Sequence, residues 1–169
     1  NEQGAFDATD YLIGKGHRSI ACVISSKQGL PTQERLLGYK NSLSHHDIPF
    51  RPELIFEVED DGMVNGIDVF QKILSVEPAV TAVFVPAGDM VAVGIIKEAK
   101  KHGKRVPEDL AVVGYDDLHA AAVVEPALTT VRQPKLEMGD YAITMIVVKT
   151  EGRESGIKHK ELNTKFIIR

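Results

Sequence analysis

Two adjacent carboxylates, Asp116 and Asp117, are the residues of this chain most suited to chemistry. They follow an apolar run, residues 110–114, that is typical of a strand buried on both faces of a parallel sheet. Open parallel sheets bind ligands at the carboxyl ends of their strands, so this position favours a binding site. Adjacent side chains diverge, so the pair would not flank one bond as a general acid and base must. A phosphoacceptor aspartate is the less favoured alternative.

Three other patterns imitate functional motifs but lack the context that each motif needs. Residues 14–16 resemble the start of a dinucleotide-binding loop, but they lack the third glycine and precede a strand. Residues 45–47, His-His-Asp, have no second ligand pair at a spacing typical of zinc. Cys22 lies in an apolar run, where an inert buried thiol is favoured over a nucleophile. We therefore predict a binding protein without catalytic residues, cofactor or metal, and not an enzyme.

Composition bounds the class of protein. The 169 residues suit about one domain, with 43% apolar and 26% charged residues as in ordinary globular proteins. A net charge of −4 argues against specific nucleic-acid binding by this segment alone. One cysteine excludes an internal disulfide and fits a reducing compartment, so we predict the cytoplasm. No membrane span or signal peptide is visible, and because the chain begins with Asn1 we expect missing upstream sequence.

The elements that position the carboxylates alternate between strands and helices. Strand cores are predicted at residues 20–24, 54–56, 82–85 and 111–113, with further strands at 128–131 and 161–168. Helices are predicted at residues 3–13, 31–45, 63–74, 90–101 and 136–149. This alternation predicts an α/β fold with a parallel sheet and helices on both faces. No strand precedes the first helix, so we expect it to pack outside this chain or on an upstream lobe.

An apolar segment follows the carboxylates. Residues 119–124, His-Ala-Ala-Ala-Val-Val, are predicted to form a loop that either folds onto its own lobe or is exposed for association. The helix at 90–101 carries two apolar stripes, one containing Val91 and Ile95 and the other Ala92 and Ile96. Two stripes are more than one buried face requires, which favours a partner surface.

The chain resembles, along nearly its whole length, the effector-binding core of the lactose-repressor/galactose-repressor family of bacterial transcription regulators. Each motif is weak alone, but their order and spacing make the resemblance specific. The motifs are Asn1-x-x-Gly4-Ala5, Gly16-His17-Arg18-x-Ile20-Ala21, Glu34-Arg35-x-x-Gly38-Tyr39, Pro78-x-x-Thr81-Ala82-Val83-Phe84, Asp89-x-x-Ala92-x-Gly94, Val106-Pro107-Glu108-Asp109-Leu110, Val113-Gly114-Tyr115-Asp116-Asp117 and Leu128-Thr129-Thr130-Val131-x-Gln133-Pro134.

The resemblance implies a periplasmic-binding-protein-like fold of two α/β lobes joined by three crossing segments, here near Gly16, Val131 and Gly156. A DNA-binding helix-turn-helix and the first half of the N-terminal lobe would precede Asn1. Residues 16–130 and the final strand in 156–169 would form the C-terminal, effector-binding lobe. Residues 1–15 would form a helix of the N-terminal lobe, and 131–155 a crossing and a second helix of that lobe.

The resemblance also implies effector-binding residues. Arg35 matches an arginine that reaches the ligand, Asp116 an aspartate that accepts hydrogen bonds from it, and Gln133 a frequent contact at the crossing. The alternatives are an ion pair between Arg35 and Asp116, and a hinge hydrogen bond at Gln133. Gly88 stands where asparagine is common and Asp61 where an aromatic residue often stacks on the ligand. These departures weaken the case for a simple sugar as the effector and leave a phosphosugar, a purine-like or another polar metabolite open.

The function implied is that of a ligand-sensing domain that controls DNA binding by a full-length homodimer. A metabolite bound between the lobes would favour one closure state, and operator DNA would be bound through the missing N-terminal domain. The runner-up is a periplasmic sugar-binding protein of a transport system. In the resembling family the C-terminal lobe dimerises through the helix at 90–101 and the loop at 118–125, so the candidate interface residues are Val91, Ile95, His119, Val123 and Val124.

Overall fold

The computed structural model describes residues 1–27, 29–76, 79–150 and 160–169. These residues form a six-stranded sheet in the order β2-β1-β3-β4-β5-β6. Strands β1 to β5 are parallel, and β6 runs antiparallel to β5. The strands are β1 (Ile20–Ser25), β2 (Ile55–Val58), β3 (Ala82–Phe84), β4 (Ala111–Asp116), β5 (Thr129–Arg132) and β6 (Lys165–Ile167). The predicted parallel pairing of the first four strands is confirmed.

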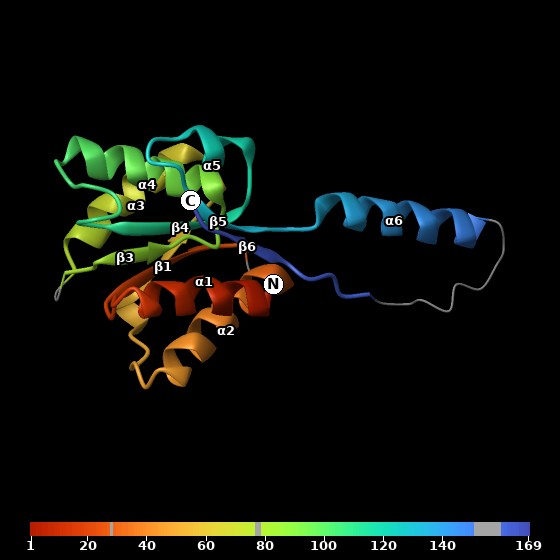
Figure 1. Ribbon diagram of the computed structural model, residues 1–169, viewed down its shortest axis with the longest axis horizontal. Helices are drawn as coiled ribbons and strands as arrows, with labels where there is room; N and C mark the ends of the chain where they lie inside the picture. Colours follow the sequence, from red (N-terminus) through yellow and green to blue (C-terminus); the bar gives the residue numbers. More distant parts are fainter. Residues whose placement is uncertain (28, 77–78, 151–159) are drawn as a thin grey trace.

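Helices cover both faces of the sheet, as predicted (Figure 1). Helices α1 (Glu2–Gly14) and α2 (Leu30–His45) cover one face, and α3 (Met63–Leu74), α4 (Asp89–Lys101) and the short α5 (His119–Val123) lie on the other. Each face has its own apolar core, because the strand side chains alternate between the two helical layers. The α/β class predicted from the sequence is therefore confirmed.

Helix α1 packs on the sheet of this chain. Its apolar residues Ala5, Ala8 and Leu12 are almost completely buried, in one cluster with side chains of β1 and α2. The expectation that this helix packs outside the chain is therefore wrong. Gly16, where a crossing was expected, instead lies in the turn between α1 and β1, two elements of the same core.

Helix α4 is enclosed by the sheet, α3 and α5. Gly66 of α3 and Gly94 of α4 lie where the helices cross, and a Cβ atom on either would collide with backbone of the facing helix. Val91 and Ile95 have no exposed surface, and the second apolar stripe is buried as well. The candidate interface contacts at Val91 and Ile95 are therefore wrong, because both side chains belong to the core of their own lobe.

Helix α6 (Lys135–Thr150) projects away from the sheet and has no buried residue (Figure 1). Its apolar side chains are exposed, among them Leu136, Met138, Ile143, Met145, Ile146 and Val147. In the described part of the chain, no helix is both long and apolar enough to cross a membrane. The crossing expected near Gly156 lies outside the described residues.

Candidate functional site

The guanidinium group of Arg35, on α2, is held at the carboxyl edge of the sheet. It stacks on the ring of Tyr115, with 3.8 Å between the guanidinium carbon and the ring centroid. Its Nη1 donates a hydrogen bond to the carbonyl of Pro86 (2.8 Å), and its Nε donates to Oδ1 of Asn1 (3.2 Å). Its Nη2 lies 3.9 Å from Oδ1 of Asp116. These contacts from three segments fix the guanidinium group in one orientation.

Asp116 ends β4 and adopts a backbone conformation that is rare for this residue type, with φ of 105°. The side-chain amide of Gln133 donates a hydrogen bond to its Oδ1, and Nζ of Lys135 donates to its carbonyl oxygen (2.8 Å). A strained residue of this kind at the end of a central strand is typical of a functional site. Arg35, Asp116 and Gln133 therefore meet, although they come from α2, β4 and the segment after β5.

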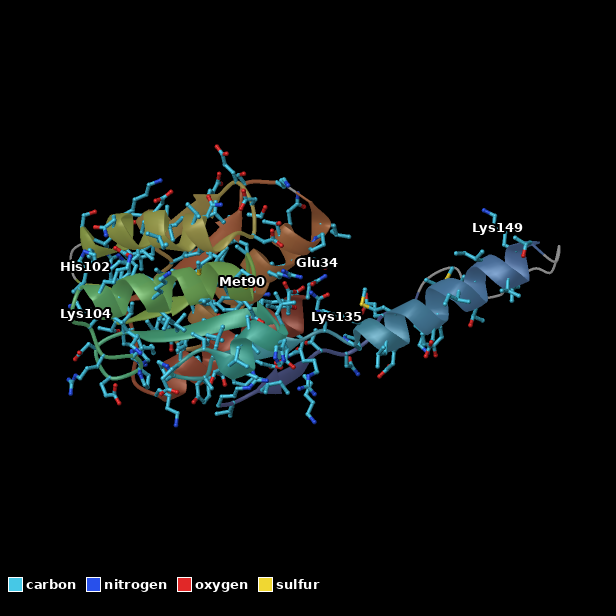
Figure 2. All side chains as sticks on the ribbon, turned by 90° about the horizontal axis from the view of Figure 1, so that it is seen from above. Glu34, Met90, His102, Lys104, Lys135 and Lys149 are labelled. Carbon is cyan, nitrogen blue, oxygen red and sulfur yellow. The ribbon has the colours of Figure 1, made fainter. Side chains whose placement is uncertain are left out.

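Gly88 and Asp61 lie next to the same carboxylate. A Cβ atom built on Gly88, just before α4, would lie 3.4 Å from Oδ2 of Asp116 and 3.7 Å from Cβ of Asp61. Asp61 is exposed in the turn before α3. Figure 2 shows the end of the sheet to which these residues belong, where Glu34 of α2, Met90 of α4 and Lys135 of α6 lie. All five sequence-predicted effector residues are thus at one edge.

Asp117 makes structural contacts that differ from those of its neighbour Asp116. Its two carboxylate oxygens accept hydrogen bonds from Arg132 and Arg169, the latter at 2.6 Å. Burial opposes ionisation of Asp117, but these two guanidinium groups outweigh it and hold its pKa below the ordinary value. The side chain fastens β5 and the end of the chain to β4, so the two carboxylates do not act as a catalytic pair.

Sequence reasoning missed Tyr115, Pro86 and Asn1 as supports of Arg35. Tyr115 is fully buried, and burial raises its pKa although the positive charge of Arg35 opposes the rise. Its hydroxyl donates a hydrogen bond to the carbonyl of Asn1 (3.4 Å). The signal available was its place beside Asp116 at a strand end, but an aromatic residue there is equally typical of a core.

The site offers carboxylate oxygens, an amide and a guanidinium group, which suit a ligand that both donates and accepts hydrogen bonds. Among the described residues, no group of three or more His, Cys, Asp or Glu side chains is placed to hold a metal ion. Cys22 is fully buried, and this burial raises the pKa of its thiol, which favours the unreactive form. These features make the edge a candidate binding site.

The segment predicted as an apolar loop forms helix α5, because its three consecutive alanines are strong helix formers. Its side chains divide between inside and outside. His119 and Val123 are exposed, Val123 to 66%, whereas Val124 packs partly against the core of its own lobe. On α4, Met90, Val93 and Lys97 reach the surface, as do Lys100 and Lys101 at its end. Part of this segment thus folds onto its own lobe and part is exposed to solvent.

Comparison with known proteins assigns the chain to a family. Residues 9–169 match the model of the periplasmic binding protein-like domain. The chain is 32% identical to the transcriptional repressor PurR of Vibrio parahaemolyticus, with all of this chain covered and 50% of that protein. It superposes on a complex of the transcriptional regulator CelR with cellobiose at a TM-score of 0.93 and 32% identity, covering 99% of this chain and 51% of that one. A sugar-binding LacI-family regulator from Escherichia coli, complexed with phosphate, gives a TM-score of 0.88 and 30% identity over 99% of this chain and 59% of that one.

The chain thus spans about half the length of the curated relatives it matches. Those relatives are transcriptional repressors and not enzymes. The fold, the match over almost the whole chain and the regulators among its structural neighbours agree. The chain therefore belongs to the periplasmic binding protein-like domains, and over its whole length it is similar to the effector-binding core of LacI-family transcription regulators.

Proposed function

We propose that this chain is one lobe of a sensor that binds a small polar metabolite and controls operator binding by a dimeric repressor. The observation that carries the proposal is the meeting of Arg35, Asp116 and Gln133 at the carboxyl edge of the sheet. Ligands of open α/β sheets bind at this edge. The residues come from three separate elements, so a ligand contacting them would sense the relative position of all three.

The chemistry of this edge favours a hydroxyl-rich, uncharged effector over a phosphosugar. Arg35 already uses its Nε and Nη1 on protein oxygens, which leaves the Nη2 end beside Asp116 for a ligand. Asp61 and Asp116 place negative charge around Gly88. Carboxylates accept hydrogen bonds from hydroxyl and N–H donors, and they repel a phosphate. A sugar or a purine-like compound therefore fits this lobe better.

We propose that a second lobe covers helix α6 and closes over the binding edge. The exposed apolar side chains of α6 make a surface that a soluble protein normally buries. In this organisation α1 joins residues 16–130 and β6 in the lobe described here, while α6 follows a crossing after β5. The effector would then lie between the lobes and favour one closure state by binding it more tightly.

Regulation would pass through a homodimer. The proposed contact uses His119 and Val123 of α5 with Met90, Val93 and Lys97 of α4, which are among the side chains of these helices that reach the surface. A two-fold contact uses each patch twice, so a small surface suffices.

DNA binding belongs to a separate part of the full-length protein, which we place in the cytoplasm. The repressor names of the relatives do not favour the alternative of a periplasmic transport protein.

A thermal-shift screen of the full-length protein tests this proposal. The panel contains cellobiose, ribose, glucose 6-phosphate and hypoxanthine, each with the wild type and with Asp116→Asn. A ligand at 100 times its Kd adds about 2.7 kcal/mol to the free energy of unfolding. We expect stabilisation of the wild type by an uncharged compound, and at most a tenth of that affinity in the variant. A compound that stabilises both proteins equally would place the effector elsewhere.

A further inference from the structure

Asp89, the first residue of α4, is a buried carboxylate that holds three elements together. Its side chain has no exposed surface. Its Oδ2 accepts a hydrogen bond from the backbone N–H of Leu118 (2.7 Å), and its Oδ1 accepts one from the hydroxyl of Thr130 (2.6 Å). In the described part of the chain, neither lysine nor arginine forms an ion pair with it. The carboxylate is thus stabilised by neutral donors alone.

The partners of Asp89 connect the binding edge with the outer surface. Gly88, immediately before it, lies beside Asp116 and Asp61. Leu118 is the residue from which α5 begins, and Thr130 lies in β5, three residues before Gln133. A Cβ atom at position 114 would collide with the carboxylate, so glycine in β4 leaves the space that it occupies.

The negative charge of Asp89 is kept at a cost in stability. Burial and, to a smaller extent, the charges of Asp116 and Asp117 on β4 raise the pKa of the carboxyl group, and hydrogen bonds from Thr130 and Leu118 lower it; the net value is about 6. An asparagine would fill the same volume without the cost of burying a charge. A buried charge of this kind next to a binding site is more typical of a functional than of a merely structural group.

We propose that Asp89 is a positioning residue, whose carboxylate ties the turn at Gly88, one wall of the binding edge, to helix α5 on the outer surface. Movement at the wall is then passed to α5 through one pair of hydrogen bonds. A ligand that contacts Asp116 also changes the negative charge of Asp116 that acts on the carboxylate of Asp89. Only the use of α5 as a partner surface rests on the proposed function; the mechanical link does not.

Amide resonances of the full-length protein, labelled with ¹⁵N at leucine and glycine, test the link. In the wild type we expect the amides of Leu118 and Gly88 to titrate together with a midpoint near pH 6. Asp89→Asn abolishes both titrations and speeds exchange of the Leu118 amide at least tenfold. Thr130→Val removes a hydrogen bond that favours the ionised form, so it moves the shared midpoint to higher pH.

Asp109→Asn is the matched control. Asp109 also accepts a hydrogen bond from a backbone N–H, that of Arg105 (2.8 Å), but in the exposed turn just before the amino end of β4. This variant must leave both titrations intact. Absence of a shared midpoint in the wild type, or equal effects of the two variants, would overturn the inference. If Asp89→Asn does not fold, the titrations of the wild type and of Thr130→Val still test the link. None of these measurements requires an effector, so their outcome does not depend on the proposed function.

Discussion

At the scale of single residues, the binding edge is built by contacts that prevent each polar group from moving. Arg35 lies on the ring of Tyr115 and is fastened at two nitrogens, while Gln133 holds the carboxylate of Asp116. Holding polar groups in place before the ligand arrives reduces the entropy that binding must supply. Motif order in the sequence singled out Arg35, Asp116 and Gln133, which the fold brings together, whereas the platform under Arg35 was not predictable.

We predict that Arg35→Ala weakens effector binding by about 2–5 kcal/mol, because it leaves the carboxylate of Asp116 without its guanidinium neighbour. Arg35→Lys should recover little, since an ammonium group cannot both stack on Tyr115 and reach Pro86 in the same way. Isothermal titration with the compound that stabilises the wild type measures both changes. Arg105→Ala is the control, as Arg105 is 71% exposed in a distant ion pair with Asp109. An unchanged Kd for Arg35→Ala would remove Arg35 from the site.

A second prediction concerns the pH dependence of stability. The folded pKa of Asp89, about 6, lies above the ordinary value of 3.8, so the folded state binds this proton more tightly than the unfolded state. Its contribution to the free energy of unfolding is therefore largest below pH 4 and declines by roughly 3 kcal/mol as the pH rises to about 6. Asp89→Asn lacks this decline, so it should destabilise the protein more at pH 4.5 than at pH 7.

Urea unfolding followed by circular dichroism at the two pH values measures this difference. Asp109→Asn is again the control: hydrogen bonds from Arg105 hold the pKa of Asp109 well below its ordinary value, so that group stays ionised in the folded state at both pH values. Its loss should cost a similar amount at pH 4.5 and pH 7. A cost of Asp89→Asn that does not vary with pH would contradict the raised pKa.

At the scale of elements, helix α4 shows why an apolar pattern does not identify a surface. The helix lies between the sheet, α3 and α5, so two apolar stripes are needed to fill its contacts inside one lobe. Its crossing with α3 depends on Gly66 and Gly94, which let the two backbones approach closely. The side chains of α4 that remain accessible are the half-buried Met90 and Val93 and the exposed Lys97, Lys100 and Lys101.

We predict that Gly94→Ala lowers the free energy of unfolding by about 1–3 kcal/mol, because the new methyl group meets the carbonyl of Met63 and forces the helices apart. Gly14→Ala, at the end of α1, is the matched control, since a Cβ atom there meets no other atom within 4 Å. Chemical denaturation of the two variants compares a crowded with an open glycine. Equal stability of the two variants would show that the helix crossing tolerates a larger separation.

The strands were predictable because short apolar runs bounded by turn residues determine parallel strands almost independently of the rest of the chain. Residues 20–24 and 111–113 lie inside observed strands for this reason. The place of α1 was not predictable, because an amphipathic pattern states that a helix is buried on one face but not which sheet it covers. The burial of Val91 and Ile95 was missed for the same reason. The spacing of apolar residues shows which faces of a helix are apolar, but it does not show how many neighbouring elements pack against them.

At the scale of the whole molecule, the candidate binding edge and the outer surface are parts of one sheet with its covering helices. Helix α4 runs from the binding edge, where Met90 lies, to the opposite end of the body at His102 (Figure 2). Helix α5 flanks its first turns and shares the carboxylate of Asp89 with it. The other lobe would close over the edge through α6, whereas a second copy would contact the outer surface. In this proposal the other lobe and the second copy of the protein would contact different ends of helices α4 and α5.

The last prediction tests that second contact. Val123→Asp places a charge on the exposed face of α5 and should weaken the homodimer of the full-length protein at least tenfold, because an unpaired charge in an apolar contact is costly. Val124 is left unchanged, since it packs against its own core and its loss would disturb the fold. Leu30→Asp is the matched control, as Leu30 on α2 is 67% exposed, like Val123 at 66%, but lies on the other face of the sheet. Sedimentation velocity over a range of concentrations measures the dimer constant of each protein. Equal constants for Val123→Asp and the wild type would move the interface away from α5, whereas a monomer that still binds the effector would place the interface there and separate dimerisation from sensing.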